Sequence, residues 1–126
     1  CGLACKANMT TNESPLKISE SEREGICIIS IDGHLDSQTA ERAQSIFTNA
    51  AEKHSRVLLD CARTTVLGSS GLRALVMTHR SAVENGGRIA VYVPRPEILE
   101  TIHISGIQKL VSIHTTMADA LAALKA

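Results

Sequence analysis

The chain has 126 residues, and its 13 lysine and arginine residues are balanced by 13 aspartate and glutamate residues. A hydrophobic fraction of 44% predicts one globular domain that buries about two-thirds of the surface of the unfolded chain. The neutral charge, the scarcity of aromatic residues, and the lack of an apolar run of about 20 residues argue against direct nucleic-acid binding and a membrane span.

Residues 1–12 form a polar leader that we expect to be disordered and outside the fold, so that the domain spans 13–126. Cys1 is either the lipid-bearing residue of a processed lipoprotein or, as we favour, a cloning remnant ahead of Met9. Cys27 and Cys61 lie in apolar runs, where a thiol behaves as a small hydrophobic side chain. The four cysteines lack the spacing of a disulfide framework or a zinc site, so we expect a reducing, cytoplasmic location.

The first part of the domain is predicted to be a hairpin followed by a helix. Residues 16–21 alternate apolar and polar like an edge strand, and a charged turn leads into the apolar run 26–31. We expect Asp32-Gly33 to end this strand, and Asp36 with Ser37 to cap a helix. This helix is expected to reach about Lys53. Its apolar stripe comprises Ala40, Ala43, Ile46, Phe47, Ala50 and Ala51.

The second part alternates strands with helices. Three apolar runs, 56–61, 89–93 and 110–113, have the continuous hydrophobicity of parallel strands that are covered on both faces. A short helix is expected from Glu97 to about His103, and Thr116 with Asp119 resembles the capping box of a final helix. A longer helix after the first of these strands has the stripe Leu72, Leu75, Val76, His79 and Val83. This order predicts an α/β domain with a mainly parallel sheet, an antiparallel N-terminal edge strand and about four helices.

The motifs of common enzyme sites are missing from the sequence. The run from Gly68 to Gly71 lacks the Gly-x-Ser-x-Gly spacing of a nucleophile elbow. No glycine-rich nucleotide-binding motif occurs. The five histidines are scattered without the spacing of metal ligands. We therefore expect a protein that is not an enzyme and that carries neither a cofactor nor a metal.

Small hydroxyl and glycine residues nevertheless gather where a predicted strand leads into the longer helix. Open α/β sheets carry functional surfaces at the carboxyl ends of their strands, and the N–H groups of a helix start favour an anion. A phosphate on Ser69 would suit this position. The alternative interpretation is purely structural: Ser69 or Ser70 caps the helix, while Gly68 and Gly71 allow a tight turn.

Three stretches of the sequence resemble the anti-sigma factor antagonists, whose fold is the STAS (sulphate transporter and anti-sigma factor antagonist) domain. Residues 33–40 (GHLDSQTA) are similar to the family segment Gly-x-Leu-Asp-x-x-Thr-Ala. Residues 59–60 and 68–72 (LD and GSSGL) are similar to its strand and its Asp-Ser-Ser-Gly-Leu signature. Residues 104–107 (ISGI) are similar to a later turn, and the likeness covers 16–125 in the family's order.

The resemblance implies a regulator of transcription that exchanges partners. In the family, the serine after the signature aspartate is phosphorylated by an anti-sigma factor that is itself an ATP-binding serine kinase with a histidine-kinase-like fold. The unphosphorylated antagonist binds this kinase and frees the sigma factor. The phosphorylated form cannot bind until a phosphatase removes the phosphate. By position the acceptor is Ser69, with Ser70 as the alternative. The implied partner-binding residues are Asp36, Thr39, Gly68, Ser69, Ser70, Gly71 and Leu72.

One position departs from the family pattern. The acidic residue before the acceptor serine is Gly68 here, so a carboxylate that orients the hydroxyl is missing. We expect Asp36 to lie near Ser69 at the same sheet edge and to supply this charge. Two alternatives stay open: a STAS interaction module without phosphorylation, such as a subunit of a stress-sensing or lipid-transport complex, and a STAS domain that binds a small ligand.

Overall fold

The computed structural model describes residues 16–125, and the leader 1–12 lies outside the described residues. One sheet contains five strands in chain order: β1 (Leu16–Arg23), β2 (Ile26–Leu35), β3 (Arg56–Leu67), β4 (Arg88–Tyr92) and β5 (Ser112–His114). The helices are α2 (Ala40–Lys53), α3 (Ser69–Glu84), α4 (Pro96–Ser105), the short 3-10 helix η1 (Ile107–Lys109) and α5 (Met117–Lys125). β1 pairs antiparallel with β2 and all other neighbours pair parallel, which confirms the predicted α/β architecture.

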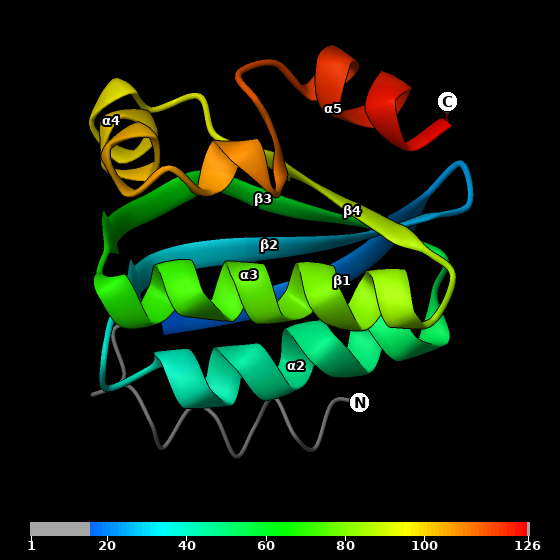
Figure 1. Cartoon of the computed structure of the whole chain (residues 1–126), viewed down its shortest axis with the longest axis horizontal. Helices are drawn as coiled ribbons and strands as arrows, with labels where there is room; N and C mark the ends of the chain where they lie inside the picture. Colours follow the sequence, from blue (N-terminus) through cyan, green and yellow to red (C-terminus); the bar gives the residue numbers. More distant parts are fainter. Residues whose placement is uncertain (1–15, 126) are drawn as a thin grey trace.

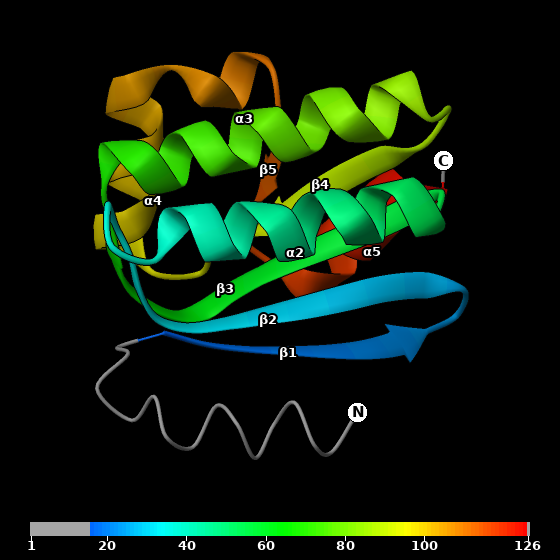
Figure 2. The same cartoon turned by 90° about the horizontal axis from the view of Figure 1, so that it is seen from below.

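The sheet lies between two unequal layers of helices. α2 and α3 lie side by side on one face, and α5 covers part of the other face (Figure 1, Figure 2). The larger core cluster lies between the sheet and the α2–α3 layer and contains the fully buried Phe47. A smaller cluster packs Leu121 and Leu124 of α5 against Leu58 of β3. The two faces are therefore covered to different extents, and α2 and α3 begin at the same end of the molecule (Figure 2).

β2 and β3 are both longer than the sequence patterns predict. The prediction that Asp32-Gly33 ends the strand is wrong, because β2 continues to Leu35 through two irregularities of register with β3. Gly33 accommodates this stretch with φ of +120°, a conformation that favours glycine. Thr64 on β3 donates a hydrogen bond from Oγ1 to the backbone oxygen of Ile31 (3.0 Å). Tertiary pairing thus extends both strands toward the site.

Two other predicted elements differ from the structure. The stripe of α3 is rotated, because this helix faces the sheet with small residues such as Ala74 and Ala82 and leaves Val83 56% exposed. The last strand is Ser112–His114 and not 110–113, because η1 precedes it and leaves Leu110 61% exposed. By contrast, the cap that Thr116 was predicted to form on α5 is present: the backbone N–H of Asp119 donates to Thr116 Oγ1 (3.1 Å).

Cys27 and Cys61 are buried free thiols, as predicted for core residues. Burial raises the pKa of the Cys61 thiol to about 12, against a smaller lowering effect of a hydrogen bond with Thr64. Burial also raises the pKa of the Cys27 thiol, and the nearby carboxylates of Glu20 and Glu22 add to the effect. Thiols with raised pKa values are poor nucleophiles, so both cysteines act as packing residues.

Candidate functional site

The predicted site residues come together where β2 and β3 end. Leu35 and Leu67 are paired at the ends of these parallel strands, so the segments that follow them leave the sheet side by side. The backbone N–H of Gly68 donates a hydrogen bond to the backbone oxygen of Leu35 (2.9 Å), which ties the start of α3 to the end of β2. The segments 36–39 and 68–72 are therefore neighbours, although a helix and a strand separate them in the sequence.

Thr39 holds the turn between β2 and α2. Its Oγ1 donates to the backbone oxygen of His34 (2.7 Å) and accepts from the backbone N–H of Asp36 (3.0 Å). The carboxylate of Asp36 accepts from the backbone N–H of Gln38 (3.0 Å). Thr39 is only 4% exposed, so its role in the site is to fix the position of Asp36.

Both helices at the site begin without a side-chain cap. Thr39, and not Asp36 or Ser37 as predicted, is the N-cap residue of α2. Asp36 instead caps the turn that leads into this helix, because its carboxylate accepts from the N–H of Gln38 and its backbone oxygen accepts from the N–H of Ala40 (2.8 Å). The interpretation that Ser69 or Ser70 caps α3 is also wrong, because Gly68 occupies the N-cap position. A serine accepts from the N–H groups of the first turn only when it stands at the N-cap, and both serines lie inside the helix.

Ser69 is the exposed first residue of α3, and the following Ser70 is half-buried. Neither hydroxyl forms a hydrogen bond with another of the residues 16–125. The first backbone N–H groups of an α-helix have no partner within the helix, and they form the positive end of its dipole. The Ser69 hydroxyl is therefore accessible, uncommitted and placed where a negative charge is tolerated.

Gly71 allows α3 to pack closely on the strand ends. A Cβ atom at this position would lie 2.6 Å from the backbone oxygen of Leu35 and 2.9 Å from the side chain of Leu67. Both distances are far below van der Waals contact, so any larger residue would push α3 away from the sheet. The glycine of the GSSGL motif thus sets the position of the two serines relative to the end of β2.

Asp36 lies beside Gly68, the residue that precedes Ser69. A Cβ atom on residue 68 would lie 3.6 Å from the Asp36 Cα and 3.7 Å from its Cβ, both ordinary contact distances. Space for a side chain at position 68 is therefore available. Steric exclusion does not explain why this chain has glycine where the family has an acidic residue. Asp36 is half-buried and is an acidic residue beside this turn.

A polar groove between α2 and α3 begins at the site. It is lined by Ser37, Ala40, Glu41, Gln44, Ser45 and Thr48 of the α2 segment and by Ser70, Arg73 and Met77 of α3. The sequence analysis missed Arg73, the charged residue of α3 in this groove. Its position four residues after Ser69, about one helical turn, is the sequence feature that could have indicated it.

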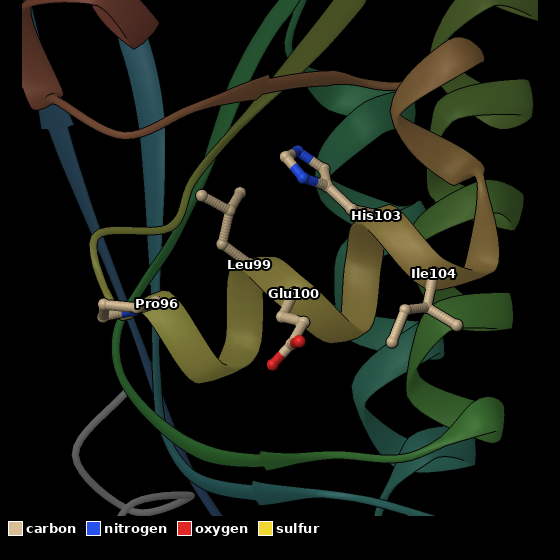
Figure 3. A pocket seen from close by; sticks show the side chains of 5 residues that line it. All are labelled: Pro96, Leu99, Glu100, His103 and Ile104. Atoms are coloured by element: carbon tan, nitrogen blue, oxygen red, sulfur yellow. The ribbon is translucent and has the colours of Figure 1, made fainter.

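A second hollow lies along α4, away from the two serines. Pro96, Leu99, Glu100, His103 and Ile104 line it. Figure 3 shows that these side chains spread outward along one helix and do not converge on a common point. Ile104 is 80% exposed there. Binding sites for small ligands enclose the ligand with a few convergent polar groups, so this hollow has no such geometry.

Residues 16–125 contain neither a metal-binding cluster nor a membrane-spanning helix. No group of three or more His, Cys, Asp or Glu side chains in this part of the chain is arranged to hold a metal ion. None of the helices in the same range combines the length and apolar character needed to cross a membrane.

The sequence model of the STAS domain matches residues 17–120. The chain belongs to the STAS domain family. An anti-sigma F factor antagonist from Paenibacillus polymyxa is 23% identical to this STAS domain over 112 residues, which are 87% of this chain and 96% of the relative. The crystal structure of an anti-sigma factor antagonist from Mycobacterium paratuberculosis matches it with a TM-score of 0.81 and 23% identity, over 91% of this chain and 97% of the other.

A structure of a protein with a phosphorylated form also matches this STAS domain. The Bacillus cell fate determinant SpoIIAA in its phosphorylated form has a TM-score of 0.61 at 17% identity, over 86% of this chain and 97% of the other. The family match and the fold thus agree with the resemblance to anti-sigma factor antagonists seen in residues 33–40, 59–72 and 104–107. The nearly complete coverage of both relatives indicates that the likeness is to whole single-domain proteins.

Proposed function

We propose that this STAS domain is an anti-sigma factor antagonist that is switched off by phosphorylation of Ser69. In this proposal it is a cytoplasmic regulator and not an enzyme, and its partners are an ATP-binding anti-sigma factor kinase and a phosphatase. The single observation that carries the proposal is the state of Ser69: an exposed, uncommitted hydroxyl at the first position of α3. Relatives by sequence and by structure that are named anti-sigma factor antagonists support the same assignment.

The proposed reaction at Ser69 is a phosphoryl transfer. Its Oγ attacks the γ-phosphorus of ATP held by the kinase, the new O–P bond forms as the bond to ADP breaks, and the hydroxyl proton passes to a base. The product carries about −1.5 to −2 charges at neutral pH. The start of α3 tolerates this charge, so the fold persists while the docking surface becomes negative. An interface penalty of about 3 kcal/mol lowers the affinity for the kinase roughly a hundredfold.

Asp36 is the proposed substitute for the carboxylate that Gly68 lacks. Its place beside Gly68 and the hydrogen bond that its backbone N–H donates to Thr39 support this role. The test is the variant Asp36→Asn, which keeps the shape and the acceptor oxygen of the side chain but removes its charge. We expect this variant to be phosphorylated at least several-fold more slowly by the partner kinase. Phosphorylation at the wild-type rate would eliminate the role of Asp36.

The acceptor itself is tested with two matched serine variants. Purified wild-type protein, Ser69→Ala and Ser70→Ala are incubated with the anti-sigma factor kinase and ATP, and the added phosphate is measured by intact mass. We expect phosphate on wild-type protein and on Ser70→Ala but none on Ser69→Ala. The reverse pattern would move the acceptor to Ser70. Absence of phosphate from all three, and from protein recovered from cells under any growth condition, would refute the switch.

A STAS interaction module without a phosphorylation switch is the second candidate. Gly68 favours it, because the acidic residue before the acceptor is absent although the space for a side chain is present. This module would bind its partner with equal affinity before and after treatment with kinase and ATP. The antagonist would lose about two orders of magnitude of affinity after the same treatment. Isothermal titration of the partner with treated and untreated protein separates the two.

A further inference from the structure

Arg73 lies one helical turn after the proposed acceptor on the same helix. Ser69 and Arg73 are four residues apart within α3, and Ser70 and Arg73 are three apart. Side chains at these spacings are neighbours on the helix surface, with Cβ atoms about 5–6 Å apart. Ser69 and Arg73 are both exposed. A guanidinium group at this position is within reach of a phosphate on either serine.

The Arg73 side chain is uncommitted in the unphosphorylated protein. It lines the groove between α2 and α3 together with Glu41 and Ser70. Among residues 16–125 it forms no hydrogen bond and no ion pair within 4.0 Å. Its five N–H donors in a planar fork match the oxygens of a phosphate in a bidentate manner. Arg73 can therefore move to a new anion without breaking an existing contact.

Two acidic residues lie near the turn and the groove. The segment 64–72 contains no charged residue, so Arg73 is the first charge that the chain carries after Arg63. Asp36 packs against Gly68, and Glu41 lies in the groove beside Arg73. Acidic residues therefore lie both beside the residue that precedes Ser69 and in the groove that Arg73 lines. Arg73 is the cation placed to balance them.

We propose that Arg73 is the internal counter-charge of the phosphorylated site. When Ser69 carries a phosphate, the guanidinium leaves the α2–α3 groove and pairs with the phosphate oxygens. Phosphorylation then changes the surface at two places, because the turn gains an anion and the groove loses a cation. The choice of Ser69 as the modified residue rests on the proposed function; the pairing itself is a property of this chain alone.

The experiment installs phosphoserine at position 69 during translation, so that no kinase is needed. The pKa of the phosphate is then measured by ³¹P NMR in otherwise wild-type protein and in Arg73→Gln. Pairing with a cation favours the doubly charged phosphate, so Arg73→Gln should raise the phosphate pKa by about 0.2–0.4, as expected for a helical ion pair at this spacing. Arg80→Gln, at an exposed site further along α3, is the matched control and should leave the value unchanged.

Two further measurements separate loss of the ion pair from a general effect of the substitution. Arg73→Lys retains the charge without the planar fork and should give an intermediate phosphate pKa. The unphosphorylated Arg73→Gln should melt at the wild-type temperature, because Arg73 has no partner among residues 16–125 in that state. Equal phosphate pKa values in wild type and Arg73→Gln would overturn the pairing. Failure of the kinase to modify Ser69 would refute the proposed function and leave the result on the pairing intact.

Discussion

Replacement of Gly71 by alanine tests how closely α3 packs on the ends of β2 and β3. The added Cβ atom would lie 2.6 Å from the backbone oxygen of Leu35 and 2.9 Å from the side chain of Leu67. The Leu35 oxygen has little freedom to retreat, because it accepts the hydrogen bond from Gly68 and belongs to a paired strand. Overpacking of this kind costs about 1–3 kcal/mol, and the higher helix propensity of alanine offsets up to about 1 kcal/mol of it. We expect the free energy of unfolding to fall by about 1–2 kcal/mol.

Urea denaturation followed by circular dichroism measures this loss of stability. Gly68→Ala is the matched control, because its Cβ would meet Asp36 only at ordinary contact distances of 3.6 and 3.7 Å. The control should lose less than about 1 kcal/mol, the difference between glycine and alanine at an N-cap. If Gly71→Ala is as stable as this control or as wild type, the close packing that we infer at the start of α3 is refuted.

Three further predictions concern the turn and the core. Gly68→Asn should stabilise the protein by a few tenths of a kcal/mol, because asparagine is a good uncharged N-cap. Gly68→Asp should stabilise it less, because its carboxylate is repelled by that of Asp36. The urea midpoints of the two variants and the wild type measure the difference. Thr39→Val should lower the free energy of unfolding by about 1–3 kcal/mol, since the N–H of Asp36 and the oxygen of His34 lose their partner, and Thr39→Ser should recover most of the loss. The pKa of Cys61 is raised from 9.0 to about 12, so the contribution of its buried neutral thiol to stability is complete below about pH 9 and is lost as the pH rises through about 12. Unfolding at pH 8 and at pH 11, with Cys61→Ala as the reference that lacks this dependence, measures the effect; an equal response of both proteins would contradict it.

The sequence predicted elements wherever the structure is governed by short-range patterns. The continuous apolar run around Leu58 becomes a strand, and the stripe through Phe47 becomes the buried face of α2. The spacing of Thr116 and Asp119 produces a hydrogen-bonded cap. These features depend on the period of side chains along one strand or helix and on contacts between residues three or four apart, which the sequence states directly.

Predictions failed where a second strand decides the outcome. Asp32-Gly33 is a turn signal, yet β2 continues through it because β3 supplies partners, among them the hydroxyl of Thr64 for the backbone oxygen of Ile31. Serines beside a glycine are typical helix caps, yet the hydrogen bond from Gly68 to Leu35 places the N-cap one residue earlier than the serines. Hydrogen bonds between paired strands and close packing outweigh the local preferences of such residues for turns and helix caps.

By itself, the sequence determined which residues are candidates for the site, namely an acidic turn and a pair of serines flanked by glycines, and it placed two cysteines in the core. Only the tertiary structure decided how they act together. The pairing of Leu35 with Leu67 brings Asp36 against Gly68, and the absence of a serine cap leaves the Ser69 hydroxyl uncommitted. The physical reason is that both results depend on the register of two parallel strands separated by a helix, and pairings between residues distant in the chain leave no local pattern in the sequence.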